Sequence, residues 1–600
     1  MARRKNDGTC VVLLRVSNEM GIRKQKWKGM NMKRRFIPVL MAILLMIVIA
    51  GGALSIWWKD KYSYGTEVMD LKTYFGIEDG KVPIFNQNER MSDKALLKDG
   101  VCYLNFNFIK SYVNDQFYYD RREKKLIYTD ALGSFVAIPG EDGYFQYEEK
   151  KEFEGQPCIL EGDELYVAIS YAALMTDLEY QANEYRLQLI TSWEPYESTV
   201  VTKETKIRYE ADVKSAILCD ADPGQNLMVL EHLEKWCKVK TQEGIVGYAE
   251  NKFLTSSVMV TPEKKQPNGS YVAPEYVTDK LSGKVCLGWH AIGGTGGNST
   301  LEDMLDGAEG MNVISPTWFS LCDNEGSFRS FGEASYVQRA HQRGLEVWAA
   351  WDDFNYENET GENIDDTVVF ASTSTRGKII ETMIKTSVEL GLDGINLDFE
   401  KVGADCHEHF GQFLRELSVE CRKNALTLSV DNYMPNEGNK QYRLDVQGKV
   451  ADYVILMGYD EHWHGSGKPG SVASIDFVTE GITKTLEYVP SNKLINAVPF
   501  YTIVWKINGS EVTDEYLTLV NEPDFIQRIA ITPAWDETTG QNYMEWSSNG
   551  KTYKVWLEDL DSISVKLNVM SAKELEGVAA WRLGYGTQEL WQLLAEFTDM

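Results

Sequence analysis

Residues 391–400 read GLDGINLDFE, and the alternation of apolar and polar side chains in this stretch decides the fold. The apolar set is Ile395, Leu397 and Phe399, and the polar set is Asn396, Asp398 and Glu400. Successive side chains of a β-strand point to opposite faces, so the three polar side chains share one face. In a parallel barrel the apolar face packs under helices and the polar face points inward. We expect Glu400, as the last residue of the strand, to reach the rim where such barrels carry out chemistry.

Seven further apolar stretches follow this plan between residues 284 and 600. They are KVCLGWHAI (284–292), MNVISPTWFSL (311–321), LEVWAAWDDF (345–354), LTLSVDNYMP (426–435), ADYVILMGYD (451–460), LINAVPFYT (494–502) and GVAAWRLGYG (577–586). Amphipathic segments such as TRGKIIETMIKTSVELG (375–391), with apolar residues at helical spacing, lie between most of them. Eight strand–helix alternations predict an α/β fold, a (β/α)8 TIM barrel over residues 284–600. Residues 502–576 are too many for one helix, and NYMEWSS and TYKVWLED within them predict a small inserted α+β lobe.

Length and charge limit the classes of protein that fit this chain. Six hundred residues are too many for one ordinary core, so several domains are expected. The formal net charge of −28 argues against a nucleic-acid partner, because phosphates would be repelled. The amino end differs: residues 1–35 hold eleven Lys or Arg and only two acids, which predicts a basic cytoplasmic segment.

An uncharged run, FIPVLMAILLMIVIAGGALSIWW, follows at residues 36–58. Twenty-three residues at about 1.5 Å each can cross a hydrocarbon layer roughly 30 Å thick. Basic residues before the run and acidic ones after it predict a single-pass signal anchor in the cell membrane, with the remaining domains extracytoplasmic. The alternative is a cleaved signal peptide, with Gly51 or Ala53 near the cleavage site.

Two small domains are expected between the anchor and the barrel. Residues 66–192 contain a weak repeat of strand, short helix and strand pair, which resembles the copper amine oxidase N-terminal-like module of bacterial envelope proteins. The segment has no histidine, so the resemblance implies a stalk and no copper. Residues 198–256, with Trp236 before a Gly247–Tyr248 strand, resemble a bacterial SH3-like barrel. Residues 260–283 contain three prolines and predict a linker.

The barrel segment resembles glycoside hydrolase family 18, and the resemblance rests on four ordered motifs over residues 284–600. DGINLDFE matches the family's strand-four signature, LMGYD its strand-six motif, VPFY its strand seven and AAWRLG its strand-eight tryptophan. The branch that it resembles most contains bacterial spore-cortex and cell-wall N-acetylglucosaminidases.

This resemblance implies a retaining mechanism in which the substrate's own N-acetyl group is the nucleophile, an exception to the two-carboxylate scheme. Glu400 would protonate the leaving oxygen and then activate water. Asp398 would hold the acetamido N–H, Tyr459 the acetamido oxygen and Asp460 a sugar hydroxyl. Trp581 would form the apolar floor beneath the sugar.

Further substrate-binding residues are expected from the same motifs: Asp393, Asn396, Met457 and Tyr501. A polar network deeper in the barrel is the alternative for Asp393 and Asn396. Many chitinases have Asp at position 396, and Asn396 should hydrogen-bond Asp398 and keep it ionised. A nearby anionic Asp398, with α-carbons about 6.6 Å apart, should raise the pKa of Glu400.

The expected function is hydrolysis of β-1,4-linked N-acetylglucosamine polymers, with peptidoglycan preferred. The alternatives are a chitinase, or a catalytically inactive glycan-binding protein on the same barrel. Histidines at 407, 409, 462 and 464 could suggest metal ligands, but the chemistry needs no metal or cofactor, so none is expected. Four tryptophans could either stack on sugars or pack in the core: Trp318, Trp351, Trp463 and Trp505.

Overall fold

The structure is a computed structural model that describes residues 33–78, 80–262, 272–277, 280–354 and 364–599. Much of the predicted basic segment, residues 1–32, and part of the predicted linker, residues 263–271 and 278–279, lie outside these ranges. The chain divides into two compact units, Met1–Tyr74 with Pro195–Val260 and Phe75–Glu194 with Thr261–Met600.

The first unit contains one long apolar helix, α1 (Lys33–Tyr62). Its segment Pro38–Lys59 is 22 residues long with a mean hydropathy of 2.7. That length and composition suit a membrane span or a signal sequence.

The same unit contains a seven-stranded sheet in the order β15-β14-β18-β17-β16-β13-β19. Its strands are β13 (Tyr196–Val200), β14 (Thr205–Arg208), β15 (Ile217–Ala221), β16 (Asn226–His232), β17 (Trp236–Lys240), β18 (Val246–Glu250) and β19 (Val258–Val260). Val239 in β17 pairs with Gly247 in β18, where a Cβ would lie 2.6 Å from the carbonyl oxygen of Arg208. Outside the strands, Val68 bridges to Ile217, so the chain just before residue 70 joins this sheet. The likeness to SH3 barrels stays a prediction.

Residues 75–194 form two sheets of the second unit. One has the order β11-β12-β1-β2-β3-β10-β9 and the other β4-β5-β6-β7-β8. The expected repeat corresponds to β3 (Val101–Asn105), α3 (Phe106–Phe108), β4 (Tyr118–Asp120) and β5 (Lys125–Thr129), then β10 (Glu164–Ala168), α4 (Ile169–Ala172), β11 (Glu179–Ala182) and β12 (Leu187–Ile190). The remaining strands are β1 (Lys81–Asn86), β2 (Glu89–Lys98), β6 (Ser134–Ala137), β7 (Tyr144–Gln146), β8 (Glu149–Lys151) and β9 (Cys158–Glu161). The likeness to the copper amine oxidase module stays a prediction.

The predicted barrel is confirmed. Eight parallel strands close in the order β20-β33-β27-β26-β25-β24-β23-β21, and β21 pairs back to β20. They are β20 (Val285–His290), β21 (Val313–Leu321), β23 (Glu346–Asp352), β24 (Gly394–Asp398), β25 (Thr427–Asn432), β26 (Tyr453–Met457), β27 (Leu494–Pro499) and β33 (Gly577–Trp581). A short strand, β22 (Phe328–Ser330), pairs antiparallel with β21. Each of the eight lies within a stretch predicted from the sequence.

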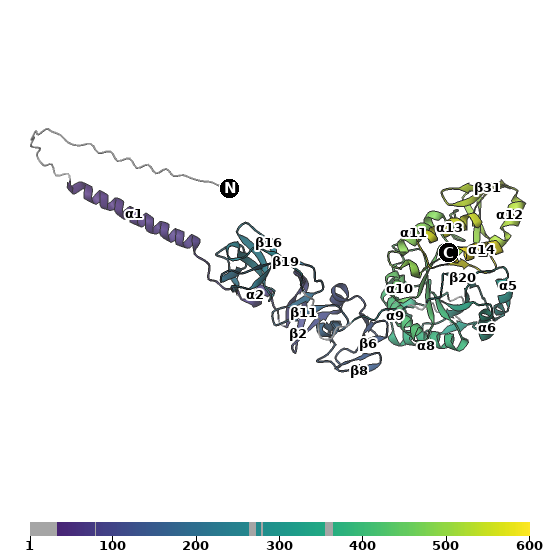
Figure 1. Cartoon of the computed structure of the whole chain (residues 1–600), viewed down its shortest axis with the longest axis horizontal. Coiled ribbons are helices and arrows are strands. Elements are labelled where there is room, and N and C mark those ends of the chain that lie inside the picture. Colours follow the sequence, from purple (N-terminus) through teal and green to yellow (C-terminus); the bar gives the residue numbers. More distant parts are fainter. Residues whose placement is uncertain (1–32, 79, 263–271, 278–279, 355–363, 600) are drawn as a thin grey trace, which may run out of the picture. The chain divides into compact units, whose positions relative to one another are not determined.

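Helices surround these strands (Figure 1). They are α5 (Leu301–Leu305), α6 (Ala334–Gln342), α7 (Asp366–Phe370), α8 (Thr373–Leu390), α9 (His407–Lys423), α10 (Leu444–Val450), α11 (Ile475–Thr485), α13 (Leu560–Ala572) and α14 (Gln588–Thr598). The amphipathic segment of the sequence forms α8, which begins at the N-cap Ser372 and ends at Gly391, whose φ of 74° suits a glycine. Ile395, Leu397 and Phe399 pack in one core with residues of α8 and α9, as the alternation predicts.

The first glycine of the strand-four motif has a steric role. A Cβ on Gly394 would lie 2.7 Å from the Trp348 ring and 2.8 Å from the carbonyl oxygen of Thr427. Only glycine therefore lets β24 lie this close to its two neighbouring strands.

The predicted lobe follows β27. It contains the sheet β29-β28-β32-β31-β30 and the helix α12 (Glu522–Ile529). The strands are β28 (Tyr501–Asn508), β29 (Glu511–Thr518), β30 (Ala534–Asp536), β31 (Gln541–Ser548) and β32 (Lys551–Leu557). NYMEWSS lies in β31 and TYKVWLED begins in β32, so the sequence placed this insertion correctly.

Candidate active site

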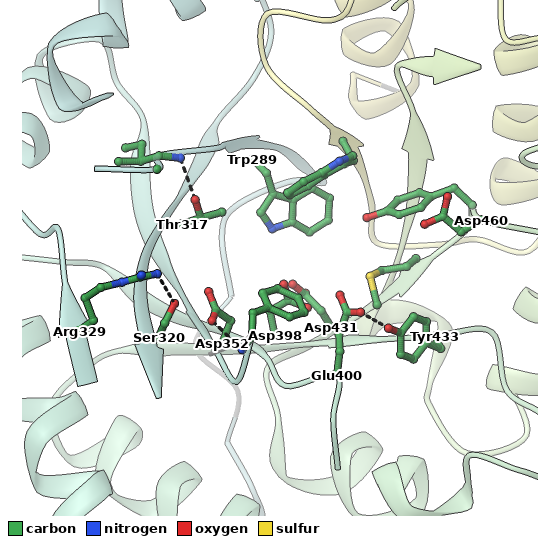
Figure 2. A pocket seen from close by; sticks show the side chains of 16 residues that line it. Trp289, Thr317, Ser320, Arg329, Asp352, Asp398, Glu400, Asp431, Tyr433 and Asp460 are labelled. Atoms are coloured by element: carbon green, nitrogen blue, oxygen red, sulfur yellow. Dashed lines mark hydrogen bonds between the residues drawn. The ribbon is translucent and has the colours of Figure 1, made fainter. Parts of the chain in front are cut away.

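An open cavity of about 480 Å³ lies at the carboxyl ends of the barrel strands (Figure 2). Strands β23, β24, β25, β26 and β33 supply most of its polar lining, either from their last residues or from the residues just beyond. The acidic side chains that line it are Asp352, Asp398, Glu400, Asp431 and Asp460. These five acids lie at or just beyond the ends of four neighbouring strands, β23 to β26, which is why residues up to 108 positions apart meet in one place.

Glu400 lies in this cavity, two residues beyond the end of β24 rather than inside the strand as expected. The Tyr433 hydroxyl donates a hydrogen bond to its carboxylate, and the Tyr442 hydroxyl donates to its main-chain oxygen at 2.5 Å. Burial raises the pKa of Glu400 to about 7. The hydrogen bond from Tyr433 opposes that rise, whereas the negative charges of Asp353 and Asp460 add to it.

Asp398 is buried beside Glu400, with 8 % of its surface exposed. Burial raises its pKa well above the usual range, and the charges of Glu400 and Asp431 act in the same direction. The raised pKa of Asp398 runs against the expectation that Asn396 keeps this carboxyl group ionised, because the loss of solvation disfavours the charged form. The expected cause of the Glu400 pKa shift is also corrected: burial comes first, and contact with Asp398 lowers that pKa.

Asn396 lies one layer deeper and does not bond Asp398. Its side-chain oxygen accepts from Trp289 Nε1 and Ser315 Oγ, both at 2.9 Å. Its amide nitrogen donates to Ser429 Oγ at 3.0 Å and to Asp431 Oδ1 at 2.7 Å. The amide thus links four strands of the barrel. Its carboxylate partner is Asp431, whereas Asp398 was the expected partner.

Aromatic and sulfur-containing side chains form the apolar part of the cavity. Trp581, at the end of β33, lies with its ring centroid 5.9 Å from that of Trp289, and both line the cavity with Met457 and Tyr459. Figure 2 shows Trp289 above the row of acids that contains Asp398. A flat apolar surface opposite carboxyl groups can hold a sugar ring by its face.

Besides Asn396, two further predicted substrate-binding residues lie outside the cavity lining. Tyr501 is buried and donates its hydroxyl hydrogen bond to Asp460, so it orients a lining residue. Asp393 precedes β24 at the opposite end of the strand, where it accepts from the main-chain nitrogen of Val347 at 2.8 Å and lies 2.7 Å from His341 Nε2. The placement of Asp393 at the substrate site is therefore a correction, whereas the alternative of a structural network fits it.

The structure also gives the surroundings of the histidines considered as metal ligands and of the tryptophans considered for sugar stacking. His409 Nδ1 lies 2.7 Å from the Tyr118 hydroxyl, and His462 Nδ1 lies 2.9 Å from the Ser471 carbonyl oxygen. His464 pairs with Asp514. Three tryptophans, Trp318, Trp351 and Trp505, are buried core residues, and Trp463 is 55 % exposed.

Sequence reasoning missed Asp431 and Tyr433, which both line the cavity. A signal existed for Asp431, because Ser429 and Asp431 alternate with the apolar Leu428 and Val430 as the strand-four residues do. It also missed Trp289 and Asp352, at or near the ends of β20 and β23. Burial raises the pKa of Asp352 to about 6, and a hydrogen bond from Ser320 opposes that rise.

The closed parallel barrel with acids gathered at the carboxyl ends of its strands defines a TIM-barrel protein with a carboxyl-rich cleft. Residues 324–586 match the model of Glycosyl hydrolases family 18. The chain therefore contains a glycoside hydrolase family 18 domain.

Individual proteins are similar to this chain over part of its length. The cortical fragment-lytic enzyme of Bacillus anthracis is 24% identical over 238 residues, which are 38% of this chain and 55% of that enzyme. The "Uncharacterized glycosylase YvbX" of Bacillus subtilis is 23% identical over 299 residues, 48% of this chain and 85% of the relative. The crystal structure of the Bacillus cereus spore cortex-lytic enzyme SleL is 21% identical, with a TM-score of 0.48, covering 53% of this chain and 76% of that one. The chain spans about half the length of the cortical fragment-lytic enzymes that it matches.

Proposed function

We propose that this protein is a retaining glycosidase that hydrolyses β-1,4 bonds of N-acetylglucosamine-containing polymers, with peptidoglycan as its substrate. The observation that carries the proposal is Glu400: a carboxyl group with a pKa of about 7, open to a cleft between further acids and an aromatic surface. A general acid works best when its pKa lies near the working pH, because it is then protonated and still able to transfer its proton.

The proposed first step is proton transfer from Glu400 to the leaving glycosidic oxygen. The carbonyl oxygen of the sugar's own acetamido group attacks the anomeric carbon from the opposite side as the glycosidic bond breaks, and an oxazolinium ring forms. In the second step Glu400, now a carboxylate, takes a proton from water, and the resulting hydroxide oxygen opens the ring with retained configuration.

Asp398 and its neighbours suit the acetamido group. Within the described part of the chain, Asp398 Oδ1 is buried without a hydrogen-bond partner, so it can accept from the acetamido N–H. We assign the Tyr459 hydroxyl to the acetamido oxygen, Asp460 to a sugar hydroxyl and Trp581 to the sugar face. Each of these three residues lines the cavity that contains Glu400.

The preference for peptidoglycan rests on two supports. The cortical fragment-lytic enzymes of Bacillus anthracis and Bacillus cereus are each similar to this chain over 238 residues. The segments at 66–192 and 198–256 resemble modules of wall-associated proteins, and we propose that they are a stalk and an SH3-like domain. The apolar segment at 36–58 would tether the enzyme to the cell membrane with the barrel outside. No nucleic acid, metal or cofactor enters the proposed chemistry.

The test is Glu400→Gln, which keeps the shape of the side chain and removes the transferable proton. We expect the release of sugar from purified muropeptides and chito-oligosaccharides to fall by about 10²-fold to 10⁴-fold. Glu437→Gln, at a side chain 92 % exposed to solvent, is the matched control and should keep full activity. Unchanged cleavage by the Glu400 variant would defeat the mechanism.

Mass spectrometry of the products decides the substrate. New reducing-end N-acetylglucosamine from wall material supports peptidoglycan, whereas cleavage of chitin alone would assign the enzyme to the chitinases. Binding without cleavage by the wild-type protein would make it a glycan-binding protein on the same barrel.

A further inference from the structure

A buried carboxylate that is not part of the proposed chemistry grips the main chain at Glu400. Asp353 follows β23 and is 1 % exposed. Its Oδ1 accepts the main-chain N–H of Glu400 at 2.9 Å, and its Oδ2 accepts that of Lys401 at 2.7 Å. Because β24 ends at Asp398, the chain at Glu400 has left the sheet, and this carboxylate supplies hydrogen bonds that a ladder would otherwise supply.

The rest of this backbone turn is fixed as well. The hydroxyl of Tyr442 donates to the carbonyl oxygen of Glu400 at 2.5 Å, and the Lys401 ammonium donates to the carbonyl oxygen of Phe354 at 2.7 Å. Glu400 is therefore held at both its N–H and its C=O. A shift of the Asp353 carboxylate would move the Glu400 main chain with it.

A second buried carboxyl group, Asp366, lies against Asp353. It is the first residue of α7, is 5 % exposed, and hydrogen-bonds to Asp353. Two buried carboxyl groups in contact hold a proton between them, because two like charges at this distance repel strongly. Burial raises the pKa of Asp366 to about 8, and the negative charge of Asp353 contributes to the rise. Burial raises the pKa of Asp353 as well, so the two carboxyl groups favour sharing a proton over carrying two negative charges.

Other titratable and charged groups face the pair from each neighbouring element. They are Asp352 at the end of β23, Asp398 at the end of β24, Glu400 and Lys401 after β24, Asp365 before α7, the Cys406 thiol before α9 and the Tyr442 phenol before α10. Lys401 is the one cation that acts on both carboxyl groups in this set, and it lowers the pKa of each. It therefore favours the singly charged pair over a fully protonated one.

We propose that Asp353 and Asp366 together position the acid Glu400: Asp353 grips the main chain at Glu400 and Lys401, and Asp366, through a shared proton, grips Asp353. The charge of Asp353 also favours the protonated form of Glu400, in which it can act as an acid. Neither side chain lines the cavity, so both act through Glu400 rather than on the sugar. The inference deepens the proposed function and rests on it for the role of Glu400.

The experiment compares Asp353→Asn with Asp365→Asn in the full chain. Asp365 caps α7 by accepting the Thr367 N–H at 2.9 Å, a role that asparagine also fills, so its variant is the matched control. Hydrogen–deuterium exchange measures the two hydrogen bonds from the main chain to Asp353 and requires no enzymatic activity. The amides of Glu400 and Lys401 should exchange at least tenfold faster in the Asp353 variant, and their exchange rates should be unchanged in the control. The pH profile of kcat/KM measures the effect of the Asp353 charge on Glu400. Its alkaline limb should move to lower pH in the Asp353 variant and stay in place in the control.

Asp366→Asn separates the shared proton from folding defects. An amide still donates to Asp353 but does not titrate, so the two amides should stay protected. In the wild type, protection corrected for intrinsic exchange should fall above about pH 8, and the Asp366 variant should lose that fall. The inference is overturned if the Asp353 variant matches the control in both measurements. A wild type that cleaves no glycan would instead defeat the proposed function, and the exchange data would still decide the grip.

Discussion

The hydrogen bond from Tyr433 to Glu400 leads to a quantitative prediction for Tyr433→Phe. The hydroxyl donates to the carboxylate, so it stabilises the charged form of Glu400 and lowers its pKa. A hydrogen bond to a charged group contributes about 1.5–3 kcal/mol, or about 1–2 pH units. Tyr433 is 40 % exposed, so water weakens the bond and the lower end applies. Removing the hydroxyl should therefore raise the pKa of Glu400 from about 7 to about 8.

The assay is the pH dependence of kcat/KM on a chromogenic chito-oligosaccharide between pH 5 and pH 9. If protonated Glu400 is the acid, the alkaline limb follows its pKa, and the variant's limb moves up by about one unit. At pH 8 the variant should keep about half of its own plateau, where the wild type keeps about a tenth. Tyr488→Phe, at an exposed tyrosine away from the cavity lining, is the control. A limb that stays in place or moves to lower pH would refute the assignment of the acid.

Three further predictions test the barrel and the site. Lys566 Nζ lies 2.9 Å from Oε2 of the fully buried Glu558, so Lys566→Met leaves that carboxylate without its cation. The free energy of unfolding, measured by urea titration, should fall by about 3–5 kcal/mol, and the double variant with Glu558→Gln should recover part of this loss. Asn396→Asp places a carboxyl group where the amide donates to Asp431 at 2.7 Å. Its folded-state pKa should rise, so stability is lost as the pH rises, and the urea midpoint should fall more at pH 8 than at pH 5. Trp581→Ala should lower kcat/KM on soluble oligosaccharides at least tenfold. Its urea midpoint should stay unchanged, which would show that the loss of activity does not come from a folding defect.

The strands of the barrel could be predicted because each is a short run rich in apolar residues, and the four strands β23 to β26 have acids at or just beyond their carboxyl ends. Burial on both sides produces such runs in parallel sheets, and the functional acids mark their carboxyl ends. The lobe after β27 was visible as an excess of chain with strand-like pieces. These features depend on local pattern alone, so a single sequence contains them.

Partners across strands could not be predicted in the same way. Asn396 and Asp398 are two residues apart on one face, about 6.6 Å along the strand, whereas a neighbouring strand lies only about 4.8 Å away. Asn396 therefore bonds Ser429 and Asp431 of β25 instead. The register between strands that decides this pairing is a property of the closed barrel.

The misplacement of Asp393 had a signal in the sequence. It lies five positions before Asp398, an odd number, so the alternation of a strand puts the two on opposite faces as well as roughly 16 Å apart. The raised pKa of Asp398 had no such signal, because it depends on how completely folding excludes water from the cavity.

The pairing inside the inserted lobe has a consequence for how proteins of this design can diversify. β28 leaves the barrel and β32 returns to it as direct antiparallel neighbours, with Trp505 opposite Lys554 and Ile507 opposite Thr552. The strand that leaves the barrel and the strand that returns to it are thus hydrogen-bonded to each other. The segment between Ile507 and Thr552 begins and ends at this strand pair. A change in the length or sequence of that segment can therefore be accommodated without breaking the pairing of the barrel strands.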